Sequence, residues 1–224
     1  MNKDLISYYK LRALEYEKIY SKPERQDDLK SLGQILQKMF AGKKVLEIAC
    51  GTGFWTEQIA HTADSIVAKD INTEVLEIAE QKLYAKNNVS FECEDLYKPN
   101  TEYTYEALFA GFIWSHIKLE DLPEFIAVLN TSVLPGSTIV LVDNNFVKGS
   151  NLPITETDDR GNTYQSRELS DGSKHQVLKN FPSQDFLQST FADYGSEFNL
   201  INLTYYWLLT YKTPLYKVST FQSF

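Results

Sequence analysis

Five short apolar runs separated by longer amphipathic stretches restrict the fold of this sequence more than any other feature. The runs lie at 45–49, 66–69, 89–92, 107–109 and 138–142. Helical periodicity occupies 55–60, 73–83 and 122–133 between them. Because neighbouring parallel strands need crossover connections, this alternation predicts an α/β, doubly wound, mostly parallel sheet with helices on both faces.

The flanking segments complete one predicted domain over 1–224. Residues 1–40 carry an apolar stripe at helical spacing and form an expected helical cap, broken near Lys22. After the central core at 44–143, residues 144–182 turn polar and rich in turn formers, which indicates a hairpin or lid. Residues 183–224 should add a helix capped by Ser183 and two last strands, making a seven-stranded sheet.

The turn after the first apolar run indicates a ligand site. A strand leads into Ala49-Cys50-Gly51-Thr52-Gly53 and then into a helix, so that small residues let a ligand approach the backbone. Thr56 stands where the dinucleotide fingerprint has its third glycine, and no Gly-Lys-Ser or Gly-Lys-Thr follows. The pattern therefore disfavours a dinucleotide site and a P-loop.

Acidic residues lie at the ends of three successive predicted strands: Glu47, Asp70 and Asp95. Asp70 follows the glycine turn at about the spacing that places a carboxylate beside ribose hydroxyls in doubly wound folds. We expect Asp95 to accept a hydrogen bond from the exocyclic amine of adenine. The set predicts an adenosine-containing ligand.

These motifs resemble those of the class I S-adenosylmethionine-dependent methyltransferases, which have a Rossmann-like fold, and the resemblance covers about 44–142. Ala49 replaces the usual first glycine, and Glu106 stands where aspartate is commoner. The resemblance implies S-adenosyl-L-methionine as cofactor. It implies cofactor contacts from Glu47, Ala49, Gly51, Gly53, Trp55, Asp70, Ile71, Asp95, Leu96, Ala110, Gly111 and Phe112.

The stretch 111–116 bears on the methyl acceptor. It lacks the Asn or Asp, Pro, Pro, aromatic run of methyltransferases that act on nucleic acid bases, and the net charge of −8 disfavours nucleic acid. Asp143 fits only half of the carboxylate pattern of metal-dependent methylation, so no metal is expected. We expect an oxygen or nitrogen nucleophile on a small molecule.

His116 is the predicted general base, because imidazole titrates near neutral pH and this residue follows the fourth predicted strand. A histidine that only bonds a neighbouring loop is the alternative. The expected substrate-binding residues are Tyr8, Tyr9, Arg12, Trp114, Tyr164, Arg167 and Lys179.

Other functions stay open at this point. The chain could hold the cofactor or S-adenosylhomocysteine without turnover, or it could be a dehydrogenase or aminopropyl transferase on the same scaffold. Because the sequence shows neither a bilayer-spanning apolar run nor a signal-peptide pattern, we expect a cytoplasmic protein without a membrane partner. We expect it to be a monomer or a homodimer.

Overall fold

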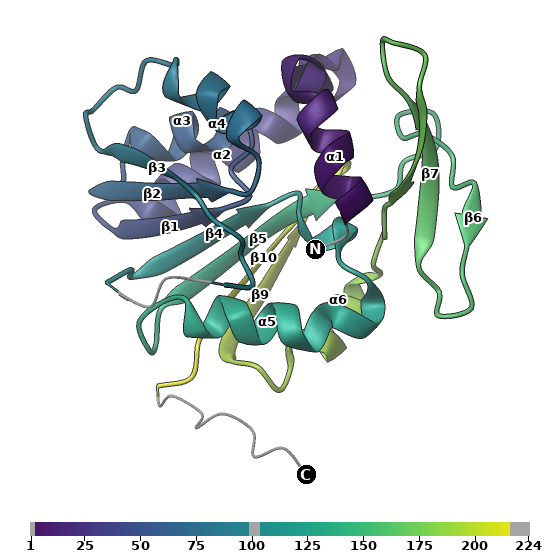
Figure 1. Ribbon diagram of the computed structural model, residues 1–224. Helices are drawn as coiled ribbons and strands as arrows, with labels where there is room; N and C mark the ends of the chain where they lie inside the picture. Colours follow the sequence, from purple (N-terminus) through teal and green to yellow (C-terminus); the bar gives the residue numbers. More distant parts are fainter. Residues whose placement is uncertain (1–2, 99–103, 216–224) are drawn as a thin grey trace.

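A seven-stranded sheet in the order β3-β2-β1-β4-β5-β10-β9 forms the centre of the computed structural model, which describes residues 3–98 and 104–215 (Figure 1). The strands are β1 (Lys44–Ile48), β2 (Ser65–Asp70), β3 (Val89–Cys93), β4 (Ala107–Gly111), β5 (Thr138–Asn144), β9 (Ser196–Asn202) and β10 (Tyr206–Lys212). Neighbouring strands among β1 to β5 are parallel, whereas β10 runs antiparallel to β5 and β9. The predicted fold class is confirmed; residues 216–224 of the predicted C-terminal segment lie outside the described residues.

Helices cover both faces of the sheet, as the alternation predicts. On one face α2 (Gln26–Phe40) and α3 (Phe54–Ala60) pack into a core around Phe109 and Leu208, with α4 (Thr73–Glu80) contributing Leu76. On the other face α5 (Leu122–Thr131) and α6 (Gln184–Phe191) pack around Trp114 and Trp207. Ser183 caps α6 by accepting the backbone N–H of Phe186 at 3.1 Å, as its position before the apolar stripe predicts.

The N-terminal segment differs in part from its prediction. It comprises α1 (Lys3–Leu11), two 3-10 helices η1 (Ala13–Ser21) and η2 (Pro23–Arg25), and then α2. The break at Lys22 is present, but a second break occurs at Arg12, where the backbone N–H of Glu15 donates to the Arg12 carbonyl at 2.8 Å in the tighter 3-10 spacing. After this break Tyr20 is buried in the core and Tyr16 packs against it.

The polar insertion folds as a small antiparallel sheet of β6 (Glu156–Thr157), β7 (Thr163–Glu168) and β8 (Lys174–Leu178), beside α1 in Figure 1. Asn180 joins it to the core by donating its backbone N–H to the Ser115 carbonyl at 2.8 Å and its side-chain amide to Ile117 at 3.0 Å. The predicted hairpin is therefore present, and its action as a lid stays a prediction.

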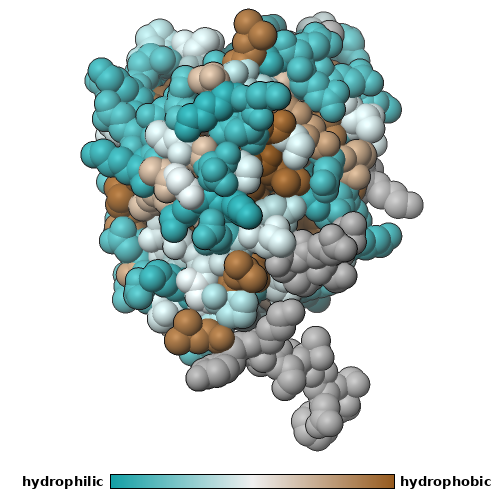
Figure 2. Space-filling view, turned by 90° about the vertical axis from the view of Figure 1, so that its left-hand side faces the viewer, coloured by the Kyte–Doolittle hydropathy of each residue, from teal (hydrophilic) through white to brown (hydrophobic). Residues whose placement is uncertain are grey.

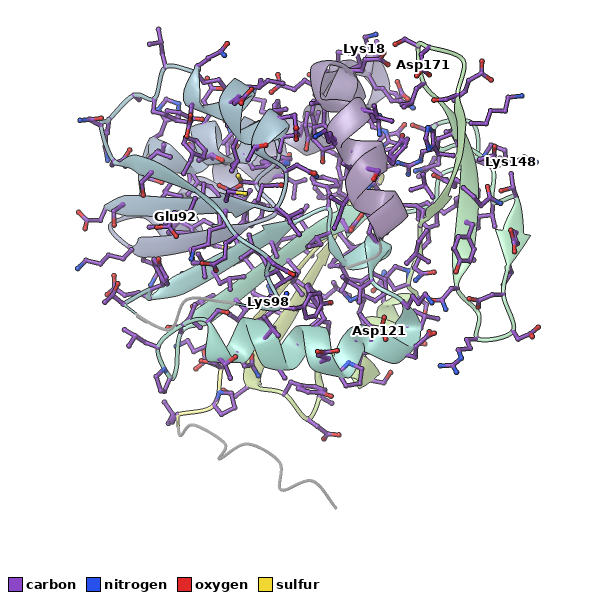
Figure 3. The ribbon with its side chains drawn as sticks, in the orientation of Figure 1. Lys18, Glu92, Lys98, Asp121, Lys148 and Asp171 are labelled. Carbon is purple, nitrogen blue, oxygen red and sulfur yellow. The ribbon has the colours of Figure 1, made fainter. Side chains whose placement is uncertain are left out.

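The surface is largely hydrophilic on the face that Figure 2 presents, with apolar residues scattered over it. Exposed charged side chains such as Asp121, Lys148 and Asp171 lie at the periphery in Figure 3. None of the helices within 3–98 and 104–215 has the length and apolar character needed to span a bilayer.

Candidate active site

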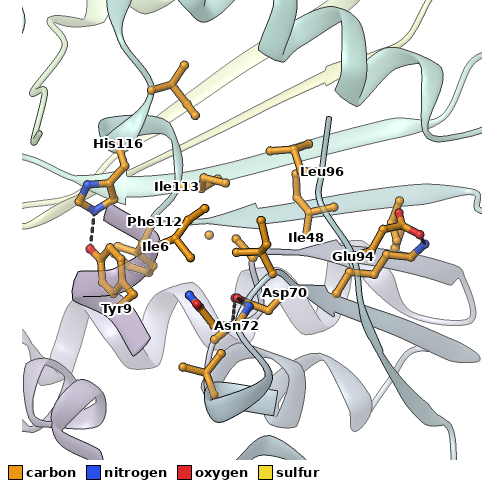
Figure 4. Close-up of a pocket in the computed structure, with 18 of the residues that line it drawn as sticks. Ile6, Tyr9, Ile48, Asp70, Asn72, Glu94, Leu96, Phe112, Ile113 and His116 are labelled. Atoms are coloured by element: carbon orange, nitrogen blue, oxygen red, sulfur yellow. Dashed lines mark hydrogen bonds and ion pairs between the residues drawn. The ribbon is translucent and has the colours of Figure 1, made fainter. Parts of the chain in front are cut away.

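The first cavity lies where the carboxyl ends of β1, β2 and β4 meet (Figure 4). Ligands of doubly wound sheets bind at this edge. Seven of the predicted cofactor residues line it: Ala49, Gly51, Asp70, Ile71, Leu96, Gly111 and Phe112. The structure thus brings together predicted residues that end or follow β1, β2, β3 and β4.

The turn after β1 has the backbone that a close ligand approach requires. Ala49, Gly51 and Gly53 all have positive φ, at 53°, 56° and 77°. Ala49 therefore adopts the left-handed conformation that the commoner glycine would adopt at lower cost. At Gly53 a Cβ atom would lie 2.7 Å from the Tyr84 hydroxyl, so a larger residue there would displace its neighbour.

Asp70 holds this turn from the end of β2. Its carboxylate accepts the backbone N–H of Gly51 at 3.0 Å and that of Asn72 at 2.9 Å. Burial raises the pKa of Asp70, while the hydrogen bonds from Asn72 and Gly51 oppose that rise. Because both carboxylate oxygens are engaged by the backbone, Asp70 fixes the shape of the turn as well as facing the cavity.

The other five predicted cofactor residues, Glu47, Gly53, Trp55, Asp95 and Ala110, do not line the cavity. Trp55 instead packs in the core behind Phe112, with ring centroids 6.0 Å apart and an interplanar angle of 18°. Asp95 accepts the backbone N–H of Tyr97 at 3.1 Å. These residues can support the cavity walls, and their direct contact with a cofactor stays a prediction.

Glu47 is fully buried beneath the turn, where burial raises the pKa of its carboxyl to about 8. Its Oε2 atom has no hydrogen-bond partner among the described residues. A neutral carboxylic acid is therefore the form that this environment favours at pH 7.

Sequence reasoning missed several lining residues of the first cavity, among them Tyr16, Asn72 and Glu94. Glu94 pairs with Lys69 at 2.9 Å, next to the predicted Asp95. Tyr16 comes from η1, and a Cβ atom built on Gly51 would lie 3.6 Å from its ring. The N-terminal segment therefore forms part of the cavity wall.

A second cavity of about 350 Å³ lies between the N-terminal segment, the insertion and the sheet. Four residues line both cavities: Tyr9, Tyr16, Phe112 and His116. The second cavity is lined by six basic residues, Arg12, Lys18, Lys22, Arg25, Arg167 and Lys179, and by only two acidic ones, Glu15 and Glu168. This basic lining contrasts with the net charge of −8 for the chain.

No arginine of the second cavity forms an ion pair among the described residues, and two of the three donate hydrogen bonds to neutral groups. Arg25 is 5% exposed and donates to Ser150 Oγ at 2.9 Å and Asn144 Oδ1 at 3.0 Å. Arg167 donates to Gln165 Oε1 at 2.9 Å and lies 5.9 Å from the centre of the Tyr8 ring. The direct hydrogen bonds of both guanidinium groups thus go to neutral groups, although Glu24 lies near Arg25 and accepts from the same Ser150 hydroxyl at 2.8 Å.

Lys179 does have a counter-ion. Its Nζ atom, in a residue 5% exposed, lies 3.0 Å from Asp143 Oδ1 and 2.5 Å from Ser115 Oγ. Burial lowers the pKa of Lys179 to about 8, although the negative charge of Asp143 opposes that shift. This ion pair joins the insertion to β5.

His116 lies in η3 (Trp114–His116), where the two cavities meet. Its Nδ1 atom is 2.6 Å from the Leu178 carbonyl oxygen and its Nε2 atom 2.7 Å from the Tyr9 hydroxyl. Burial, with Lys179 and Arg167 nearby, lowers the pKa of His116 well below its usual value. The imidazole is therefore neutral at pH 7.

The predicted substrate residues separate into two groups. Tyr8, Tyr9, Arg12, Arg167 and Lys179 line the second cavity. Trp114 is fully buried in the core, with its ring 5.8 Å from that of Trp207. Tyr164 lines neither cavity and donates its hydroxyl to Asp158 at 3.3 Å.

Comparisons with known proteins agree with this geometry. A family described as "Methyltransferase domain" matches residues 45–136. Over 91 residues the chain is 34% identical to a malonyl-[acyl-carrier protein] O-methyltransferase of Bacillus cereus, a match covering 38% of this chain and 34% of the relative. The enzyme of the same name from Bacillus anthracis is 34% identical over 87 residues, covering 37% and 30%. The chain thus matches about a third of the length of these curated relatives.

Two solved structures resemble the whole chain. A structure titled "DhpI-SAH complex structure" has a TM-score of 0.77 at 23% identity and covers 95% of this chain and 96% of its own. Another, titled "DhpI-SAM-HEP complex", has a TM-score of 0.76 at 23% identity and covers 94% and 98%. At this identity the likeness concerns the fold. Residues 45–136 thus match a methyltransferase domain, in agreement with the predicted family, and the whole chain shares the fold of these two structures.

Proposed function

We propose that this chain transfers a methyl group from S-adenosylmethionine to an oxygen or nitrogen of a small molecule that carries a negative charge. The observation that carries the proposal is the basic second cavity, which shares four lining residues with the first. An acceptor in the second cavity would lie next to the reactive end of a cofactor in the first. The names of both curated relatives support oxygen as the nucleophile.

The first cavity fits the cofactor. Asp70 presents a carboxylate at the cavity, and Gly51 leaves the backbone of the turn accessible. Ile71 and Leu96 provide apolar surface for an adenine ring. When bound, the cofactor supplies an electrophilic methyl group on a sulfonium centre. The chain's own part is to align the acceptor and to exclude water, which the N-terminal segment and the insertion favour by lining the sites.

The charge of the second cavity supports an anionic acceptor. A cation withdrawn from water without a direct ion pair is costly, and no ion pair among the described residues includes the buried Arg25 or the half-buried Arg167, whose hydrogen bonds go to neutral groups. A carboxylate or phosphate group would supply the missing charge and accept paired hydrogen bonds from a guanidinium. The volume of about 350 Å³ suits a small molecule.

A turnover assay tests the proposal. Purified chain with S-adenosylmethionine is offered small carboxylic acids, phosphate monoesters and a malonyl thioester, each beside a neutral ester or amide analogue, and S-adenosylhomocysteine is measured. We expect turnover with an acid and little with its neutral analogue. Arg167→Gln should raise the KM for that acid about tenfold or more, because a charge-assisted hydrogen bond contributes about 1.5 to 3 kcal/mol.

The matched control is Arg160→Gln in the same insertion, since the Arg160 side chain is 68% exposed and pairs with Glu120 at 3.4 Å. This variant should keep the wild-type KM. Equal turnover of acids and neutral analogues would contradict the anionic acceptor. Binding of S-adenosylhomocysteine without turnover of any acceptor would instead favour a module that holds the cofactor.

A further inference from the structure

Tyr9 and His116 form a hydrogen-bonded pair at the boundary between the two cavities (Figure 4). Tyr9 comes from α1, His116 from η3, and Leu178 ends β8, so three separate parts of the chain meet at one imidazole ring. The ring planes of Tyr9 and His116 are nearly perpendicular, at 77° with centroids 5.3 Å apart. The contact between the two rings is therefore edge-on, and the hydroxyl meets Nε2 at 2.7 Å.

The partners of the imidazole fix its tautomer. A backbone carbonyl oxygen only accepts, so the 2.6 Å contact with Leu178 requires the proton on Nδ1. A neutral imidazole then has its lone pair on Nε2, where the Tyr9 hydroxyl donates. The Nε2 atom, which is the basic atom of His116, is thus covered by the Tyr9 hydroxyl. A methyl acceptor that enters from the second cavity would therefore meet the Tyr9 oxygen first.

The surrounding charges favour this arrangement before any reaction. Burial raises the pKa of Tyr9 more than the charges of Arg167 and Arg12 lower it. The phenol is therefore protonated. Burial, Lys179 and Arg167 lower the pKa of His116, opposed by Asp143. The pair rests as neutral phenol and neutral imidazole.

We infer that Tyr9 is a catalytic residue that takes the proton of the acceptor and relays its own proton to His116. The inference rests on the proposed function and applies to an acceptor oxygen that enters protonated, as a hydroxyl or a singly protonated phosphate. As the oxygen–carbon bond to the methyl group forms and the carbon–sulfur bond breaks, the acceptor proton passes to the Tyr9 oxygen and the phenolic proton passes to Nε2. The positive charge lost at sulfur reappears on the imidazolium, so charge and atoms balance.

Tyr9→Phe separates this relay from direct action of His116. If His116 acts directly, the variant uncovers Nε2 and turnover stays level or rises, which would overturn the inference. With the relay, turnover falls about 10²- to 10⁴-fold, the typical contribution of a positioned proton acceptor. The dissociation constant of S-adenosylhomocysteine should change less than about threefold. Tyr194→Phe is the control, because Tyr194 packs against the core beside α6 and lines neither cavity.

A second measurement needs no acceptor and no turnover. Nitrogen-15 NMR of His116 should show a protonated Nδ1 and an unprotonated Nε2 at neutral pH. Tyr9→Phe should raise the pKa of His116, because it removes a hydrogen bond to the neutral form. A protonated Nε2, or a pKa that Tyr9→Phe leaves unchanged, would refute the pair. If the NMR result holds but the wild type methylates no acceptor, the proposed function fails, and the relay fails with it as a catalytic step.

Discussion

The two cavities differ in how the chain builds them. The first is made mainly from short motifs at the ends of consecutive strands, with Gly51 and Asp70 joined by one hydrogen bond across 19 residues. The second joins distant segments: Arg25 contacts Ser150 across 125 residues, and Tyr9 contacts His116 across 107. The difference teaches that the predicted cofactor cavity follows mainly from local sequence, whereas the proposed acceptor cavity depends on tertiary packing of the N-terminal segment and the insertion.

The largest expected effect concerns the ion pair that joins the insertion to β5. Lys179→Met removes the counter-ion of a buried carboxylate, Asp143, and should lower the free energy of unfolding by about 3 kcal/mol or more. Denaturant unfolding monitored by fluorescence measures the change. The loss should appear first as increased hydrogen exchange in β8 and little in β1 or β2, because Lys179 follows β8.

Lys174→Met is the matched control for that variant. Lys174 lies in β8 too, but its side chain is 72% exposed and its pair with Glu168 spans 3.7 Å. Exposed pairs contribute at most about 1 kcal/mol, so this variant should stay within that range. If both variants lower the free energy of unfolding equally, the buried pair does not stabilise the attachment of the insertion to β5.

The sequence predicts the first cavity better than it predicts the second. The motif that ends in Gly53 and the acid at Asp70 predict the first cavity, because backbone conformation and strand-end placement follow from nearby residues. The place of Arg25 in the second cavity cannot be predicted in this way, because no neighbouring residue in the sequence indicates that it is buried against Ser150. The position of Trp114 after the fourth strand predicts contact with the acceptor, whereas its large apolar ring packs against Trp207 in the core.

The second expected effect concerns Glu47 beneath the first cavity, and its size per pH unit is intermediate between the other two. Its folded-state pKa of about 8 lies above the unfolded value near 4.3, so the folded chain binds the extra proton between these values. The stability from this group is fully present below the unfolded pKa and is lost as pH rises through the folded pKa. The free energy of unfolding should therefore decrease by up to about 1.4 kcal/mol per pH unit between about pH 5 and 8.

Glu47→Gln removes that titration and keeps a side chain of nearly the same shape. Unfolding of both proteins across pH 5 to 8 should give a flatter curve for the variant. If the two curves run parallel, Glu47 is ionised in the folded chain across this range, and the hydrogen bond from Thr56 outweighs the effect of burial.

The smallest expected effect tests the turn itself. Ala49 has a φ of 53°, a left-handed conformation that costs a residue with a Cβ atom about 1 to 2 kcal/mol, whereas glycine adopts it freely. Against this gain, glycine loses about 0.5 to 1 kcal/mol more conformational entropy on folding than alanine. Ala49→Gly should therefore stabilise the chain by about 0.5 to 1 kcal/mol, seen as a higher unfolding midpoint.

The same substitution in a helix should change the stability in the opposite direction. Ala127 lies exposed in α5, where glycine is about 1 kcal/mol less favourable than alanine, so Ala127→Gly should destabilise the chain by about that amount. A gain at Ala49 beside a loss at Ala127 can only come from the backbone conformation, because the chemical change is identical. A loss at both positions would mean that the Ala49 methyl group contributes packing that outweighs its strain. The turn would then depend on side-chain contacts, as the second cavity does, and the contrast between the two cavities would be weaker than the geometry indicates.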